Sequence, residues 1–244
     1  MGRIRATRKD FVLDVGSGSH PHSTADVLVE RFLEDVHGHR SHTPAAHDRP
    51  LICADIHNLP FLDKTFDYAI CNHVVEHVDD PETALAELSR VAKRGFLGVP
   101  SEFYEFICPT HTHKWVFALK DGVLLMKPLR DGHHLGLRMY GGIFFTLYAL
   151  PEFRRLVSNR PDLFGVTLEW EDSIRFRLVD ESFEFYDYSD AESVRELLKP
   201  APADGPADAV KRFMRAHLDP SSIERLSSLR AGLRRAMKKS SRAR

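Results

Sequence analysis

The chain has 244 residues, of which 43% are hydrophobic and 28% are charged. This composition predicts one globular domain with its own core and argues against wholesale disorder or a fibrous class. The net charge of -1 gives no overall positive field that would draw the chain to nucleic acid. No apolar run approaches the roughly 18 residues that cross a bilayer. Three cysteines and no secretory segment predict thiols without disulfides, so we expect a soluble, cytoplasmic protein.

The first elements along the chain are short apolar runs, which are typical of buried parallel strands. We expect strands over residues 11–15, 25–30 and 51–54. The second run also resembles a helix start, because Asp26 follows Ser23 at the spacing of an N-terminal cap. A strand is favoured, since residues 38–50 have no strand character and cannot supply the strand in its place.

A strand–helix–strand unit follows. Residues 66–71 and 95–99 are predicted strands, and Asp80 and Pro81 open a helix between them. Apolar residues follow helical spacing in this segment: Ala84, Leu85, Leu88, Val91 and Ala92. This alternation predicts an α/β fold with a mostly parallel sheet, helices on its faces and ligands at the carboxyl ends of its strands.

The alternation of predicted strands and helices ends after Pro100. Residues 114–128 read as a hairpin, with Asp121 and Gly122 in the turn, inside an insertion over residues 101–142. A helix is expected over 150–157, and one or two strands over 165–179 should complete the sheet. Three prolines and a glycine make 199–208 a linker between a domain at 1–198 and a basic helical tail at 209–244.

The clearest chemical pattern is the sequence V-L-D-V-G-S-G at residues 12–18. Gly16 and Gly18, on either side of Ser17, allow the backbone to approach a ligand where a Cβ would clash. Asp14 at the strand end can accept hydrogen bonds from an amino group and from loop amides. A plain turn explains the glycines alone about as well.

Acidic residues follow the next two predicted strands. Glu30 closes the second strand and can bind two ribose hydroxyls, and Asp55 follows the third strand and can accept a hydrogen bond from an adenine amine. A single acid at a strand end is ordinarily a solvated side chain. Two at successive strand ends after a glycine turn favour a nucleotide-like ligand.

Residues 54–81 carry a third pattern: an Asp, then L-P-F, F-D, a strand, E-H-V and D-P. Together with the glycine turn, this segment resembles the methyltransferase type-11 domain over about Phe11 to Ser101. The resemblance implies a Rossmann-like fold and S-adenosylmethionine as the cofactor. It places Asp14, Gly16 and Gly18 at the methionine part of that cofactor.

The same resemblance assigns the remaining cofactor contacts. It puts Glu30 on the ribose, Asp55 and Ile56 at the adenine, and Asn72 beside the sulfonium. The chain departs from the family pattern in two ways. His20 stands where the loop usually has its third glycine, and the short separation of Gly18 and Glu30 leaves room for about one helical turn, with Glu34 as the alternative acid.

In methyl transfer, side chains chiefly position the nucleophile. A base is needed as well if the nucleophile must lose a proton. Candidate bases lie at predicted strand ends and in the insertion: His73, Glu102, Tyr104, His111 and His113. The aromatic residues of the insertion either stack on the acceptor or pack it onto the sheet.

Two patterns suggest a metal instead. His73 to His77 spells H-x-x-E-H, a zinc-protease motif that requires both histidines on one helical face. The resemblance places these residues in a strand end and loop, and no third ligand stands at a useful spacing. The histidines at 111, 113, 133 and 134 more often lie on a surface. We therefore predict no metal site.

The sequence thus predicts a methyltransferase that modifies the oxygen or nitrogen of a small molecule or of a lipid- or saccharide-linked metabolite. Two alternatives stay open: a binding module of this fold without turnover, and an NAD-dependent oxidoreductase, which Pro21 in the third glycine position disfavours. The basic tail either docks on the domain, contacts an anionic membrane surface or holds a phosphate-bearing partner. Nucleic acid is not the expected acceptor.

Overall fold

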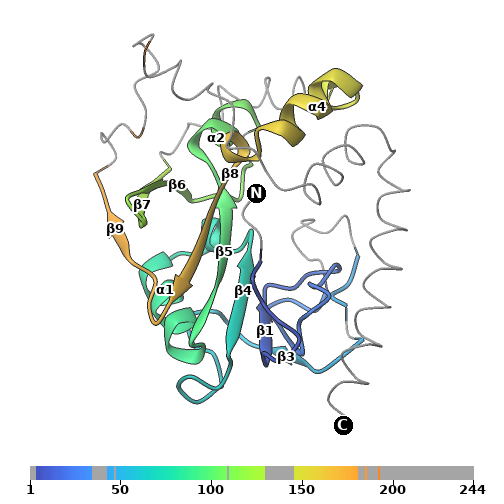
Figure 1. Cartoon of the computed structure of the whole chain (residues 1–244), viewed down its shortest axis with the longest axis vertical. Coiled ribbons are helices and arrows are strands. Elements are labelled where there is room, and N and C mark those ends of the chain that lie inside the picture. The colour runs from blue at the N-terminus through green and yellow to red at the C-terminus, as the bar shows by residue number, and fades with distance from the viewer. Residues whose placement is uncertain are drawn as a thin grey trace.

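The central feature of the computed structural model is a six-stranded sheet with the order β3-β2-β1-β4-β5-β8 (Figure 1). Its strands are β1 (Val12–Val15), β2 (Val27–Glu30), β3 (Leu51–Cys53), β4 (Tyr68–Asn72), β5 (Arg94–Pro100) and β8 (Gly165–Glu171). The first five are parallel, and β8 runs antiparallel to β5. The structure describes residues 4–34, 43–46, 48–108, 110–129, 146–180, 185 and 192.

Side chains of the central strands are buried on both faces of this sheet, as continuous apolar runs require. Leu13 and Ala69 point into one core cluster, and their neighbours Val12 and Tyr68 point into a second cluster on the opposite face. Ile4 and Ala6 pack against the second cluster. The N-terminal segment therefore covers part of that face.

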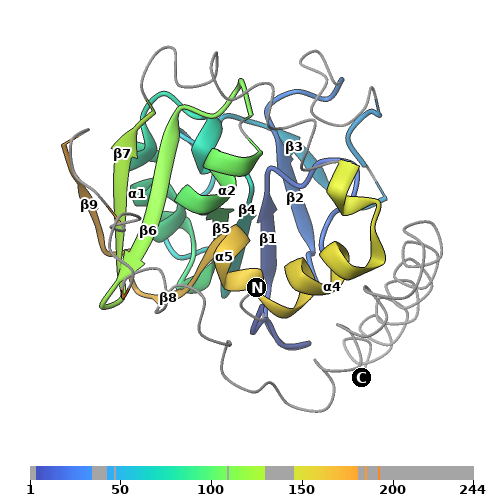
Figure 2. The same cartoon turned by 90° about the horizontal axis from the view of Figure 1, so that it is seen from above.

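Helix α1 (Pro81–Val91) covers the first face, as its sequence predicts. The carboxylate of Asp80 accepts a hydrogen bond from the amide of Thr83 at 3.0 Å, and Pro81 occupies the first turn. In Figure 2, α1 lies on one side of the row of strands and α4 (Pro151–Asn159) lies on the other. The short helix α5 (Pro161–Phe164) then leads into β8.

A second sheet of three strands has the order β6-β7-β9, with β6 (Trp115–Lys120), β7 (Val123–Pro128) and β9 (Phe176–Leu178). Strands β6 and β7 form the expected hairpin, and its turn residues Asp121 and Gly122 have φ values of 50° and 70°. Phe117 and Leu124 are fully buried in the cluster that α1 also joins. The hairpin is therefore part of the core on that face.

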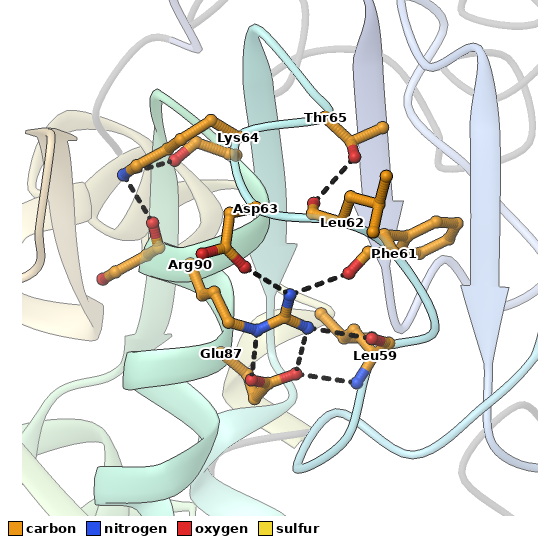
Figure 3. Close-up of polar contacts among 10 residues, drawn as sticks. Leu59, Phe61, Leu62, Asp63, Lys64, Thr65, Glu87 and Arg90 are labelled. Carbon is orange, nitrogen blue, oxygen red and sulfur yellow. Dashed lines mark hydrogen bonds and ion pairs between the residues drawn. The ribbon is translucent and has the colours of Figure 1, made fainter.

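The loop between β3 and β4 is fastened to α1 by one arginine (Figure 3). Arg90 donates hydrogen bonds to the carbonyl oxygens of Leu59 at 2.9 Å and Phe61 at 2.7 Å, and pairs with the carboxylates of Glu87 and Asp63. Glu87 in turn accepts a hydrogen bond from the amide of Leu59 at 2.8 Å. These contacts hold the L-P-F segment at residues 59–61 against helix α1.

Three elements differ from the expectation or lie beyond it. Residues after Pro100 form an unpredicted helix, α2 (Glu102–Ile107), whose first turn is capped by the Ser101 hydroxyl, which accepts a hydrogen bond from the amide of Tyr104. The 165–179 segment was expected to complete the main sheet; β8 does so, whereas β9 lies beside β7 and pairs with it in parallel as the third strand of the second sheet. The linker and the basic tail lie outside the described residues.

Two expectations about the chemistry of the whole chain can be compared with the structure. Cys53, Cys71 and Cys108 are free thiols. Among the described residues, no helix has the length and apolar character needed to cross a membrane.

Candidate functional site

The candidate site lies at the carboxyl ends of β1, β2, β3 and β4. The loop after β1 turns sharply because Gly16 and Gly18 have φ values of 68° and 58°, which side chains disfavour. The amide of Gly16 donates a hydrogen bond to the carbonyl oxygen of Val29 at 2.8 Å. An ideal Cβ on Gly16 would lie 2.2 Å from Cγ2 of Val74, so the loop fits tightly against the residues after β4.

Asp14 ends this first strand in a buried position, with 5% of its surface exposed. Its carboxylate accepts a hydrogen bond from the amide of His22 at 2.7 Å. Burial raises the pKa of Asp14 to about 7, although the His22 bond and the charge of Arg49 lower it in part. Nearby, the hydroxyl of Ser17 is buried without a hydrogen-bond partner.

Glu30 at the end of β2 is also buried, and it accepts a hydrogen bond from the amide of Gly18. The described residues between β1 and β2 contain turns and no helix, in line with the short separation seen in the sequence. Glu30 therefore closes the glycine loop directly. Glu34, the alternative acid, is exposed.

Asp55 follows β3 and lies at the same edge as Glu30. Its carboxylate contacts Nδ1 of His57 at 2.6 Å and Nη1 of Arg31 at 3.2 Å. Burial raises the pKa of Asp55, but the bonds from His57 and the charge of Arg31 outweigh burial and hold the pKa below its ordinary value of 3.8. Ile56 beside it is buried.

Asn72 and His73 occupy the end of β4. Asn72 pairs with Gly98 of β5 and is exposed. His73 adopts a φ of 58°, and its Nδ1 lies 3.0 Å from Oε1 of the fully buried Glu76. Burial lowers the pKa of His73, but the bond to Glu76 outweighs this and raises the pKa above 6.5. Both exposed side chains therefore lie at the carboxyl end of β4, at the same edge of the sheet as Asp14 and Glu30.

The other candidate bases differ in their surroundings. Glu102 is buried and paired with Lys127 at 2.7 Å. Burial and the thiol of Cys108 raise the pKa of Tyr104 well above its ordinary value. His113 is buried against the carboxylate of Glu105, whereas His111 is exposed. Among these four, only His111 presents an exposed side chain.

The structure groups the histidines in a way that the sequence did not indicate. In the H-x-x-E-H segment, only Val75–His77 is helical, a single 3-10 turn that starts after His73, so the motif does not form one helical face. Glu76 and His77 instead lie beside His113, and their ligand atoms fall within 4.8 Å of one another. The expectation that no third ligand was available overlooked His113, because a histidine distant in sequence gives no spacing signal. Glu76 and Glu105 were not singled out.

Comparison with known proteins supports the family suggested by the motifs. The family model of the type-11 methyltransferase domain matches residues 13–97. Demethylmenaquinone methyltransferase of Corynebacterium urealyticum is 39% identical over 62 residues, which are 25% of this chain and 27% of the relative. The aligned region therefore spans about a quarter of that relative.

Two solved structures show similarity over part of the chain. One is an S-adenosylmethionine-dependent methyltransferase of Thermotoga maritima, with 23% identity over 38% of this chain and 45% of that chain and a TM-score of 0.30. The other is an arsenic(III) S-adenosylmethionine methyltransferase of Chlamydomonas reinhardtii, with 18% identity over 38% and 39% of the two chains and a TM-score of 0.29.

The matched segment includes β1 except Val12, β2 to β4, helix α1 and most of β5, and so contains every residue that the motifs assigned to the cofactor. The order of the parallel strands agrees with the Rossmann-like architecture that the resemblance implied. The family implies S-adenosylmethionine as its cofactor. Residues 13–97 therefore match the type-11 methyltransferase domain family.

Proposed function

We propose that this chain transfers a methyl group from S-adenosylmethionine to an oxygen or nitrogen of a small molecule or of a lipid- or saccharide-linked metabolite. One observation carries the proposal: a buried carboxylate, Asp14, ends β1 directly before a loop in which Gly16 and Gly18 have positive φ. This arrangement lies inside the segment that matches the methyltransferase domain.

The residues of the glycine loop fit the polar end of such a cofactor. Burial disfavours the ionised carboxylate of Asp14. A cationic amino group bound beside Asp14 would favour the ionised carboxylate and would pair with it. The buried Ser17 hydroxyl has no partner within the described structure and offers a further hydrogen bond. Both features support a bound ligand that carries hydrogen-bond donors.

The remaining contacts follow the strand ends. Glu30 and Asp55, at successive carboxyl ends, offer acceptors for ribose hydroxyls and an adenine amine, and the buried Ile56 offers an apolar contact beside the base. Asn72 would then lie nearest the sulfonium. When bound, S-adenosylmethionine supplies an electrophilic methyl group, so the protein has chiefly to position the acceptor and exclude water.

The acceptor is expected to enter over the carboxyl ends of β4 and β5, where the chain leaves the sheet after Pro100; residues 130–142 of the expected insertion lie outside the described residues. Among the candidate bases, His73 and His111 are the two with exposed side chains. Glu102 is engaged by Lys127, and His113 by Glu105. Comparing turnover of the His73→Ala and His111→Ala variants tests which of the two assists the acceptor.

Cofactor binding and turnover provide the test. S-adenosylmethionine or S-adenosylhomocysteine at 100 times its Kd should stabilise the fold by about 2.7 kcal/mol, which a melting experiment detects, and NAD should give no shift. Labelled cofactor incubated with a metabolite extract should then yield a labelled small product. Equal stabilisation by NAD would contradict the cofactor assignment, and binding without any transfer would indicate a binding module.

A further inference from the structure

A compact group of metal-binding side chains lies next to the candidate site. The metal cluster consists of Glu76 and His77 from the 3-10 turn after β4 and His113 from the loop before β6, with ligand atoms within 4.8 Å of one another. Glu76 is fully buried and His113 has 8% of its surface exposed. Tetrahedral zinc holds such ligands about 3.4 Å apart, so a small contraction would complete the geometry.

Each member of the metal cluster is held by a second group. Oε1 of Glu76 contacts Nδ1 of His73 at 3.0 Å, and Nδ1 of His77 lies 3.3 Å from the carbonyl oxygen of Thr112. Nδ1 of His113 bonds to Oε1 of Glu105. Outer partners of this kind fix the tautomer and the orientation of metal-binding side chains, and they leave Nε2 of each imidazole as the coordinating atom.

The two carboxylates of this region each have one oxygen without a partner. Oε2 of Glu76 and Oε2 of Glu105 are buried, and neither has a hydrogen-bond partner in the described structure. The lysines near this region form ion pairs with other acids: Lys114 with Asp79, and Lys127 with Glu102. A buried carboxylate oxygen without a partner is unfavourable, and a divalent ion bound to Glu76 would remove that cost for Glu76.

We propose that Glu76, His77 and His113 bind one divalent transition-metal ion, with Glu105 orienting His113. Two imidazoles and one carboxylate are a ligand set that suits zinc, with the fourth position left for water. The ion would tie the loop before β6 to the turn after β4. The proposal goes beyond methyl transfer and does not depend on it.

This arrangement assigns a different role to the H-x-x-E-H segment. His73 contacts Oε1 of Glu76 and so acts as an outer partner of that carboxylate. The histidine that completes the site is His113, whose ring centroid lies 4.7 Å from that of His77. His111, two residues earlier, is exposed and outside the cluster, which makes it a matched control.

Cobalt(II) binding to the full chain is the direct test. After removal of metal by a chelator, titration should give one cobalt per chain, with the intense visible absorption of a four-coordinate site, and zinc should displace it. The His77→Ala and His113→Ala variants should bind at least 100-fold more weakly, whereas His111→Ala should bind like the parent. Glu105→Gln should weaken binding about 10- to 100-fold, as expected for an outer partner.

Two controls separate loss of metal binding from misfolding: the isosteric variant Glu76→Gln, and thermal unfolding of each variant without metal. Zinc should raise the melting temperature of the parent and of His111→Ala but not of Glu76→Gln. A parent chain that shows no four-coordinate cobalt spectrum overturns the proposal. Cobalt binding that persists unchanged in Glu76→Gln, His77→Ala and His113→Ala also overturns it, because the ion would then be held by other residues.

Discussion

The carboxamide of Asn72 occupies the space that a side chain on Gly98 would need, since an ideal Cβ at Gly98 would lie 2.2 Å from Oδ1 of Asn72. The two residues pair across β4 and β5. We expect Gly98→Ala to displace the Asn72 side chain at a cost of about 1 to 3 kcal/mol in stability. Because Asn72 is the proposed neighbour of the sulfonium, cofactor affinity measured by calorimetry should fall as well.

A double-mutant cycle separates this effect from general overpacking. In the Asn72→Ala background, Gly98→Ala should cost little further affinity, because the side chain it displaces is already absent. If the two substitutions lower cofactor affinity additively, Gly98 acts on the site by a route other than Asn72.

Stability should depend on pH through Asp14. Its folded-state pKa of about 7 lies above the ordinary value of 3.8, so the folded chain binds the extra proton between these values. The contribution of this protonated carboxyl group to the free energy of unfolding is fully present below about pH 4 and is lost as the pH rises through 7. Asp14→Asn should therefore be more stable than the parent at pH 8, by up to roughly 4 kcal/mol, and equal to it near pH 4. Urea unfolding at both pH values measures the difference, and a constant difference would contradict this assignment.

Asp55→Ala should weaken cofactor binding more than it weakens the fold. Asp55 is partly exposed and its bonds to His57 and Arg31 lie near the surface, so their loss costs little stability. Loss of a hydrogen-bond acceptor for the adenine should cost about 1 to 3 kcal/mol in binding, measured by calorimetric titration. Glu34→Ala, which removes an exposed acid outside the proposed adenine contact, is the control. Unchanged cofactor affinity in Asp55→Ala would contradict the assignment.

The contacts of Arg90 predict a stability effect without a direct ligand effect. Arg90→Ala should destabilise the fold by about 1 to 3 kcal/mol, because the carbonyl oxygens of Leu59 and Phe61 lose their donor. Arg90→Lys should not restore the parent stability, since an ammonium group cannot reproduce the forked geometry. Asp63→Ala should have a small effect, because that partner is 76% exposed. Equal destabilisation by Asp63→Ala would show that the charge pair, and not the carbonyl contacts, holds the loop.

Truncation after Leu218 should leave a folded chain that binds the cofactor, because the proline-rich segment at 199–208 is expected to separate the tail from the domain. Circular dichroism and cofactor-induced melting shifts check this. An unfolded truncated chain would place the apolar residues of the tail in the core. A folded chain that loses affinity for anionic vesicles would support membrane contact through the tail.

Local patterns predicted the main sheet well, since each strand from β1 to β5 is a short apolar run with a clear end. The hairpin followed from Asp121 and Gly122 in the same way. Helix α2 was missed, because its capping residue, Ser101, follows a strand directly and no linker marks the start. The proximity of Glu76 and His113 was missed for another reason: the two residues meet only after the hairpin packs on the sheet, and spacing along the chain does not record such contacts.

The route of the chain between its two sheets limits how the protein can be engineered. Strand β8 belongs to the main sheet, and β9, after the turn at 172–175, is the third strand of the hairpin sheet. That turn is anchored: the carbonyl oxygen of Asp172 accepts a hydrogen bond from Lys64, and the amide of Ile174 donates one to the Ser89 hydroxyl at 3.0 Å. A chimera that exchanges the hairpin for that of a relative would have to carry β9 with it, because a hairpin moved alone would leave one of its edges unpaired.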